Sequence, residues 1–312
     1  MTPATTVDVE GRRLRLSNPD KVLYPEVGFV KADVIEHYRS LAPVLLPHLQ
    51  GRPVTRKRWP NGVGAGPFFE KNAPRGTPSW VPIVELPAPG STKNRETVHY
   101  VLVDDLPTLV WLGNLAALEL HIPQWRVDPD RSGAYPDRLV FDLDPGPGTS
   151  IIQCAQVGLL LAEVLADAGL RAYPSTSGSK GLQLYVGLDG DAEANQVNAY
   201  AHQVAIGIEK QAPKHVVSDM KRALREDKVL IDWSQNNAAK TTIAPYSLRG
   251  RDQPTVATPV TWEEVEATAR STAQQQLPLR FWTDDVVDRV AEHGDLLRSV
   301  FDDRYALPDH QP

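Results

Sequence analysis

The segment RLVFDLDPG, residues 138–146, constrains the fold more than any other stretch of this chain. Side chains alternate between the two faces of a β-strand, so Asp142 and Asp144 share one face while the apolar residues share the other. The Pro-Gly pair ends the strand at once, which places both carboxylates at the rim of a sheet. Two adjacent carboxylates repel each other unless a cation lies between them, and oxygen-only ligands suit magnesium or manganese. The segment predicts a strand with a metal-binding pair, although a solvated strand end is the alternative.

A second acidic strand follows in KVLIDWSQN, residues 228–236. The alternation places Leu230 and Asp232 on one face of this strand, so Asp232 is an acid near the end of an apolar strand. Three strand carboxylates supply what two-metal phosphoryl transfer requires. Taken alone, Asp232 also fits a helix cap or a salt-bridge partner.

The loop STSGSKG, residues 175–181, leads into a third predicted strand. A Ser- and Gly-rich loop with a lysine can offer backbone N–H groups and a cation to phosphates. The loop lacks the spacing of a Walker A loop, and a flexible turn is the alternative. Gln183 is predicted to point away from Leu182 and Leu184, toward the same site as the loop.

The order of predicted elements favours an α+β fold, because regular strand–helix alternation is too sparse for a doubly wound parallel sheet. We expect a single domain over residues 1–306 and a disordered tail over residues 307–312. Helical spacing of apolar residues predicts helices over 31–48, 106–120, 151–169, 193–211, 262–273 and 284–300, with Thr283 as the cap of the last. Strands are predicted around residues 7–16, 53–59, 99–103, 138–146, 182–188 and 228–233.

Composition limits the class of protein. The net charge of −6 argues against a general nucleic-acid coat but not against a polymerase, which needs only a local basic surface. The single cysteine, Cys154, excludes an internal disulfide framework and a cysteine-rich zinc site, and its apolar neighbours predict a buried thiol. There is no apolar run of about 18 residues and no signal-peptide pattern, so we expect a cytoplasmic protein that does not bind a membrane.

Together these acidic strands and the serine loop resemble the archaeo-eukaryotic primase superfamily, and more closely the polymerase domain of bacterial DNA ligase D. The resemblance covers nearly the whole chain, through the ordered segments LSNPDKVLYP, RKRWPNG, FFEKNAP, LELHIPQWR, FDLDPG, SGSKGL, IDWSQNNAAKTTIAPYSLRGR and AEHGDLL. It implies a primase-like core of mixed and antiparallel sheets flanked by helices.

The resemblance also implies a role for individual residues. It implies catalytic metal ligands at Asp142, Asp144 and Asp232, holding two Mn²⁺ or Mg²⁺ ions. It implies contacts with the incoming NTP or dNTP from Lys57, His121, Ser177, Lys180, Gln183 and Arg249. Phe68 and Phe69 are expected to stack on a template base. Asn18, Lys21 and Lys31 are expected to bind a 5′-phosphate on the downstream side of a gap.

The sequence departs from the family pattern at Gln183, where the family carries a histidine. Glutamine can hydrogen-bond a phosphate but cannot carry charge. The departure bears on nucleotide affinity and leaves the three aspartates untouched.

The resemblance implies a template-directed polymerase that extends DNA 3′ ends at gaps and double-strand breaks and prefers ribonucleotides. Its expected partners are DNA ends, Ku and a DNA ligase. The chain has no ligase KxDG motif, so it either acts alone or is a segment of a larger enzyme. Two other hypotheses remain: a non-catalytic module that binds DNA ends, and a metal-dependent glycosyltransferase, which explains neither Asp232 nor the paired phenylalanines.

Overall fold

The computed structural model describes residues 5–87, 96–130, 133–272 and 279–309. The chain divides into two compact units that are interleaved along the sequence. Unit 1 takes Met1–Ile122, Ile243–Val256 and Trp282–Gly294, and unit 2 takes Pro123–Thr242, Ala257–Phe281 and Asp295–Pro312. Helices and mostly antiparallel strands confirm the α+β fold.

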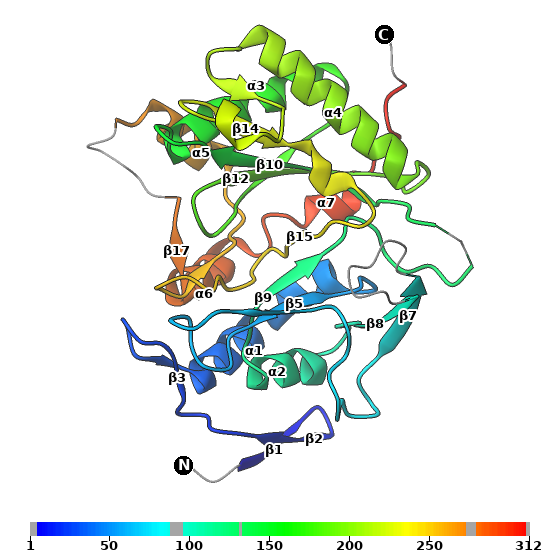
Figure 1. The fold of residues 1–312 in the computed structure, drawn as a ribbon, viewed down its shortest axis with the longest axis vertical. Coiled ribbons are helices and arrows are strands. Elements are labelled where there is room, and N and C mark those ends of the chain that lie inside the picture. The colour runs from blue at the N-terminus through cyan, green and yellow to red at the C-terminus, as the bar shows by residue number, and fades with distance from the viewer. Residues whose placement is uncertain (1–4, 88–95, 131–132, 273–278, 310–312) are drawn as a thin grey trace. The chain divides into compact units, whose positions relative to one another are not determined.

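Unit 2 is built on a sheet with strand order β11-β12-β10-β14-β13 (Figure 1). One face of the sheet packs against α3 and α4 and forms the main apolar core of the unit, which includes Phe141, Leu143 and Cys154. Cys154 is fully buried, as its neighbours predict. The elements of unit 2 are β10 (Arg138–Pro145), α3 (Ile151–Asp167), β11 (Tyr173–Thr176), β12 (Leu182–Gly187), α4 (Ala194–Gln211), β13 (Val216–Val217), a 3₁₀ helix (Arg222–Leu224), β14 (Val229–Asp232), a second 3₁₀ helix (Trp233–Asn236), α5 (Trp262–Arg270) and α7 (Ser299–Asp302).

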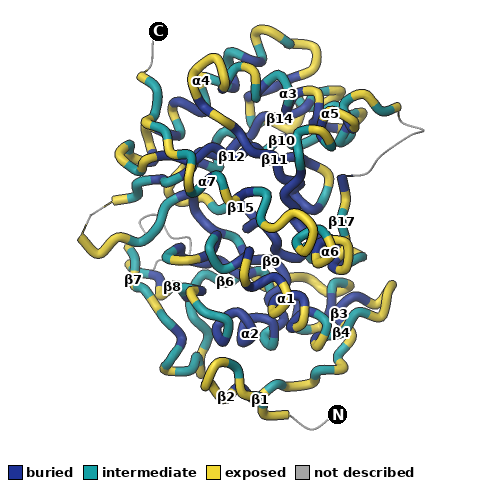
Figure 2. The backbone as a smooth tube through the Cα atoms, turned by 180° about the vertical axis from the view of Figure 1, so that it is seen from behind, coloured by how far each residue is buried: buried dark blue, intermediate teal, exposed yellow. Residues whose placement is uncertain are grey.

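Unit 1 contains a second sheet with strand order β15-β9-β5-β6, and α1 packs against both α2 and α6. Figure 2 shows β9 and the inner side of α1 as buried. The elements of unit 1 are β1 (Thr5–Val9), β2 (Arg12–Leu16), β3 (Val22–Tyr24), β4 (Phe29–Val30), α1 (Lys31–Leu49), β5 (Thr55–Arg58), β6 (Phe68–Glu70), β7 (Ile83–Pro87), β8 (Thr97–Val101), α2 (Leu106–Asn114), β9 (Ala117–Ile122), β16 (Thr255–Val256) and α6 (Thr283–His293), with β15 (Thr242–Ile243) and β17 (Phe281–Trp282) at its boundaries.

Two predicted helices are wrong in extent. The helix expected over 106–120 ends at Asn114, and Ala116 adopts a left-handed φ of 55°, after which the chain continues as strand β9. The helix expected over 284–300 ends at His293, because Gly294 has a φ of 67°, and its first residue is Thr283, so Thr283 is not the cap. A local break by a left-handed residue overrides the continuous apolar pattern in both cases.

The predicted tail, residues 307–312, is described only in part. Leu307 packs against the core of unit 2, whereas residues 310–312 lie outside the described residues.

His37 on α1 makes the stability of unit 1 depend on pH. Its Nε2 lies 3.1 Å from the carbonyl oxygen of Tyr246, and burial lowers its pKa from 6.5 to about 4. Between pH 6.5 and pH 4 the unfolded chain therefore binds a proton that the folded chain excludes, so the unfolding free energy falls as the pH falls through this window. Across the whole window the loss amounts to about 3 kcal/mol.

We expect His37→Gln, which keeps a side-chain donor but does not titrate, to flatten this pH dependence. Thermal unfolding at pH 7 and pH 5 measures the difference, and substitution of the exposed His99 by glutamine is the matched control. An unchanged pH slope in the His37 variant would contradict the assignment.

Candidate functional site

The three predicted metal ligands lie on one face of the unit 2 sheet. Strands β10 and β14 are antiparallel, and their register pairs Asp142 directly with Asp232. Directly opposed residues point to the same face, and Asp144 follows two positions along β10, so it shares that face. The opposite face of β10 is the apolar core. The strand phase predicted from the sequence therefore agrees with the structure.

Asp232 also caps the short helix that follows it. Its Oδ1 accepts hydrogen bonds from the backbone N–H and the hydroxyl of Ser234, and its Oδ2 accepts one from Gln235 Nε2 at 2.8 Å. Within the described residues, no three His, Cys, Asp or Glu side chains are gathered into a cluster that could hold a metal ion. The donor chemistry nevertheless fits a hard divalent cation, because three carboxylates on adjacent strands present only oxygen ligands to one face.

Gln183 lies on the other side of Asp142, on strand β12. The register pairs the two residues, and Gln183 Nε2 donates to Asp142 Oδ1 at 3.3 Å. The hydroxyl of Tyr185 donates to Gln183 Oε1 at 2.9 Å, which fixes the orientation of the amide. Gln183 and Tyr185 are both buried. Gln183 therefore faces the acidic group, as the alternation predicts, and its amide contacts a carboxylate.

The serine loop between β11 and β12 is held by hydrogen bonds between its own residues. Ser177 Oγ accepts the backbone N–H groups of Ser179 and Gly181, at 3.3 and 3.1 Å, and the N–H of Ser177 donates to the carbonyl of Gly181. Lys180 is exposed at the tip of the loop. A Cβ atom added at Gly181 would lie 2.3 Å from the carbonyl oxygen of Leu143 and 3.6 Å from Asp144 Oδ1. The loop therefore lies directly against the acidic strand.

The remaining predicted nucleotide-binding residues belong to unit 1 and surround one buried carboxylate. Glu119, which is 1% exposed, lies 3.0 Å from Lys57 Nζ and 2.9 Å from His121 Nε2. Its Oε1 is 3.4 Å from Arg249 Nε and accepts the backbone N–H of Gly250 at 3.1 Å. We call Glu119, Lys57, His121 and Arg249 the Glu119 cluster.

The charges of the Glu119 cluster are set by its own members. Burial alone would raise the pKa of Glu119, but the hydrogen bond from His121 and the charges of Arg249 and Lys57 outweigh it and hold the pKa well below its usual range. Burial lowers the pKa of His121, which favours its neutral form. A charged Glu119 can only accept hydrogen bonds, so the His121 nitrogen that contacts it, Nε2, must carry the proton of the neutral ring.

Sequence reasoning missed Glu119. It lies two residues before His121, and strand alternation would have placed both on one face. The apolar pattern predicts that ALEL continues the preceding helix, which hides this alternation, whereas β9 begins at Ala117.

Phe68 and Phe69 lie on edge strand β6 and are each 56% exposed. The register pairs Phe69 with Lys57, and Lys57 in turn with Glu119, so Phe69 shares the face of the Glu119 cluster. Phe68 pairs with Arg58 and points to the opposite face. The two rings therefore do not share one face of the sheet.

The predicted 5′-phosphate residues gather in unit 1. The N–H of Lys21 donates to the carbonyl of Asn18, and the N–H of Lys31 donates to the carbonyl of Lys21. Lys31 is buried, and its Nζ donates to the carbonyl of Ser17 at 2.6 Å. Burial lowers the pKa of Lys31, and the nearby charges of Lys21 and Arg58 lower it further. The fold thus holds cations together, an arrangement that an anion would stabilise.

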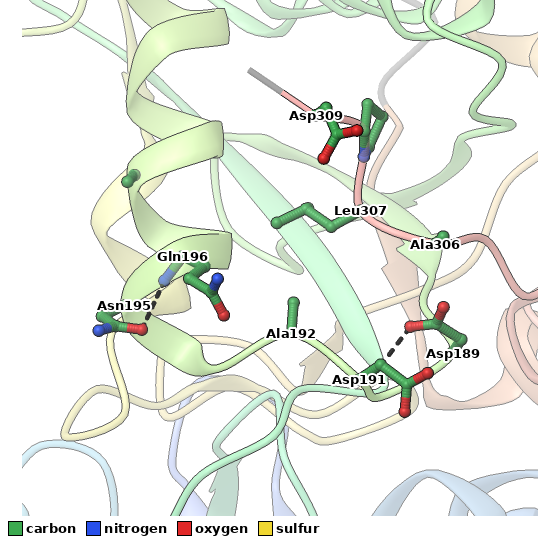
Figure 3. Close-up of a pocket in the computed structure, with 10 residues that line it drawn as sticks. Asp189, Asp191, Ala192, Asn195, Gln196, Ala306, Leu307 and Asp309 are labelled. Carbon is green, nitrogen blue, oxygen red and sulfur yellow. Dashed lines mark hydrogen bonds between the residues drawn. The ribbon is translucent and has the colours of Figure 1, made fainter.

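A pocket of about 700 Å³ lies elsewhere in unit 2 (Figure 3). It lies between the turn at Asp189 and Asp191, the start of α4 and the chain from Ala306 to Asp309. None of the site residues predicted from the sequence lines this pocket.

Among the described residues, every helix is too short or too polar to span a membrane. The family described as "LigD, primase-polymerase domain" matches residues 30–297. The chain is 48% identical over 286 residues to the multifunctional non-homologous end joining protein LigD of Mycolicibacterium smegmatis, an alignment that covers 91% of this chain. It is 30% identical over 301 residues, or 96% of this chain, to the bifunctional non-homologous end joining protein LigD of Bacillus subtilis.

The fold is similar to a solved structure described as the polymerase domain of Mycobacterium tuberculosis ligase D in complex with DNA. The TM-score is 0.85 and the identity 43%, and the match covers 94% of this chain and 99% of that one. The chain spans only 36% of the length of the Mycolicibacterium relative and 45% of the Bacillus relative.

Proposed function

Because this chain belongs to the LigD primase-polymerase domain family, a family of nucleotidyltransferases, we propose that it extends DNA 3′ ends by template-directed nucleotide transfer at gaps and double-strand breaks. The observation that carries this proposal is the register that pairs Asp142 with Asp232 and places Asp144 on the same face. The similar solved structure is a complex with DNA, which supports a nucleic-acid substrate.

Asp142, Asp144 and Asp232 would hold two divalent ions, Mn²⁺ or Mg²⁺. When bound, such ions lower the pKa of the attacking 3′-hydroxyl and neutralise charge on the leaving pyrophosphate. The chain itself contributes a rigid platform, since β10 is fixed by strands on both sides and by an apolar core beneath it. Gln183 holds one oxygen of Asp142 from the side of β12.

Nucleotide contacts are proposed for two groups of residues, each described within its own unit. In unit 2, Ser177, Lys180 and Gln183 would contact the triphosphate, and the closed loop presents the exposed Lys180. In unit 1, the contacts would come from Lys57, His121 and Arg249. Lys57 and Arg249 are cations, whereas neutral His121 has only Nδ1 left to accept a hydrogen bond.

The DNA would be held mainly by unit 1. Phe69, on the face of Lys57, would stack on a template base, and Phe68 would meet the DNA from the opposite face of β6. Asn18, Lys21 and Lys31 would bind the 5′-phosphate across the gap. The expected setting is cytoplasmic end joining with Ku and a DNA ligase, consistent with relatives named as end-joining proteins.

Primer extension on labelled, gapped DNA tests the proposed function. We expect extension that requires Mn²⁺ or Mg²⁺ and is faster with GTP than with dGTP opposite the same template base, measured as kcat/KM. A site discriminates strongly when one of its buried groups pairs with a hydroxyl that the competitor lacks. DNA binding without extension under any metal would favour a non-catalytic end-binding module, a hypothesis motivated by the uncharged Gln183.

The 5′-phosphate site gives a separate prediction. The wild-type protein should bind a gap with a 5′-phosphate more tightly than one with a 5′-hydroxyl, and Lys21→Ala should reduce this preference. A charge-assisted contact contributes about 1.5–3 kcal/mol, and less at high salt. Binding to both DNAs at low salt measures the effect, with the exposed Lys214→Ala as control. Equal wild-type affinity for both DNAs would contradict the assignment.

A further inference from the structure

Glu119 is a buried acid in a group of residues expected to bind the negatively charged triphosphate nucleotide. It is 1% exposed and contacts Lys57, His121, Arg249 and the backbone N–H of Gly250. We propose that Glu119 is a positioning residue that prearranges Lys57, His121 and Arg249 to receive the triphosphate nucleotide. This inference rests on the proposed function for the nucleotide and concerns how its binding groups are held.

The two oxygens of Glu119 hold different parts of the cluster. Oε2 contacts Lys57 Nζ and His121 Nε2, which come from the neighbouring strands β5 and β9. Oε1 pairs with Arg249 and accepts a hydrogen bond from the N–H of Gly250, and both residues come from a distant part of the sequence. One carboxylate therefore joins the central strands of the sheet to the segment around residue 250.

The surroundings restrict this geometry further. Lys57 Nζ also lies 5.2 Å from the centre of the Trp59 ring. A Cβ atom at Gly250 would lie 2.2 Å from that ring, so only glycine allows the backbone to come this close to Trp59. Lys57 is thus held between an aromatic ring and a carboxylate. Without Glu119, two cations would repel each other at a largely buried position.

Glu119 also selects the tautomer of His121. The contact to Oε2 requires the proton on Nε2, so Nδ1 becomes the acceptor. Loss of the carboxylate would allow both tautomers, and the ring would present a mixture of donor and acceptor to a ligand.

A simpler hypothesis predicts a change of nucleotide affinity in the opposite direction. If Glu119 only neutralises excess charge, then Glu119→Gln adds one net positive charge to the cluster and tightens triphosphate binding. If Glu119 positions Lys57 and Arg249, the same substitution weakens binding even though it makes the cluster more positive. The direction in which Glu119→Gln changes triphosphate affinity separates the two hypotheses.

The experiment measures binding of GTP with Mn²⁺, without DNA, to the full chain. We expect Glu119→Gln to weaken binding about tenfold, the effect of losing one charge-assisted contact. In primer extension, KM for GTP should rise with little change in kcat. Glu70→Gln is the matched control, because Glu70 also pairs with an arginine of β5, Arg58, at 2.9 Å but points to the opposite face. It should leave GTP affinity unchanged.

A double-mutant cycle separates positioning from a general effect on the fold. In a Lys57→Ala/Arg249→Ala background, Glu119→Gln should have little further effect on GTP affinity, because the groups it positions are absent. The inference would be overturned if Glu119→Gln caused an equal loss of GTP affinity in both backgrounds, or if it tightened GTP binding in the wild-type background. If Lys57→Ala/Arg249→Ala itself leaves GTP affinity unchanged, the proposed nucleotide role of these residues fails instead.

A measurement without nucleotide tests the tautomer directly. Nitrogen-15 NMR of the imidazole should show His121 protonated at Nε2 in the wild type and a mixture of tautomers in Glu119→Ala. A single unchanged tautomer in Glu119→Ala would overturn this part of the inference, whether or not the protein extends DNA.

Discussion

Alanine at Asp142, Asp144 or Asp232 is expected to abolish primer extension while the protein remains folded. The metals that these carboxylates would hold contribute several kcal/mol to the transition state, and each 1.36 kcal/mol is a factor of ten, so the loss should reach about a thousandfold. Single-turnover extension on gapped DNA with Mn²⁺ measures the effect. Near-normal rates in two of the three variants would show that the metal assignment is wrong.

The three variants should differ in stability. Asp142→Ala and Asp144→Ala remove one of two neighbouring carboxylates, which relieves repulsion. Asp142→Ala also removes the acceptor of the buried Gln183 amide, which costs about 1–3 kcal/mol. Asp232→Ala also removes the cap of the helix Trp233–Asn236, which costs about 1 kcal/mol. Asp232→Asn keeps the acceptor for Ser234 and should lose activity with less loss of stability. Asp189→Ala is the control, because Asp189 follows β12 at the opposite end of the sheet.

Gly181→Ala is expected to lower both the stability of the protein and the rate of extension. Its new methyl group would lie 2.3 Å from the carbonyl oxygen of Leu143. The methyl carbon is attached directly to the backbone and the oxygen is part of it, so the loop or the strand must move. Overpacking of this kind costs about 1–3 kcal/mol. A shift of about 1 Å at a catalytic centre can cost about a hundredfold in rate.

Thermal unfolding and extension rate together test this prediction, and Gly207→Ala provides the control. Gly207 lies inside α4 with nothing within 4 Å of an added Cβ, so alanine there should stabilise the helix by about 1 kcal/mol. Wild-type stability and rate in Gly181→Ala would show that the loop does not press against the acidic strand.

The sequence predicted the parts of the candidate site that depend on strand alternation. The shared face of Asp142 and Asp144, and the directions of Asp232 and Gln183 away from the apolar side chains of their strands, follow from a period of two within short apolar strands. Their approach to one another was not derivable, because the pairing of β10 with β12 and β14 joins residues far apart in the chain.

The Glu119 cluster shows what sequence patterns miss. An apolar run through residue 120 reads as one helix, and nothing in its composition marks the left-handed Ala116 at which the strand begins. Without that break, Glu119 and His121 are not recognised as neighbours on one face. The contact of Arg249 with Glu119 joins segments 130 positions apart, which periodicity cannot reveal.

The interleaving of the two units has a consequence for synthesis on the ribosome. All strands of the unit 2 sheet lie between residues 138 and 232, so this sheet can close before the later segments are made. Unit 1 begins earlier but needs Thr283–His293, the helix that packs against α1. The part of α1 that packs against α2 (Leu106–Asn114) can be covered early, whereas the part that packs against α6 stays uncovered while the strands of the unit 2 sheet are being made.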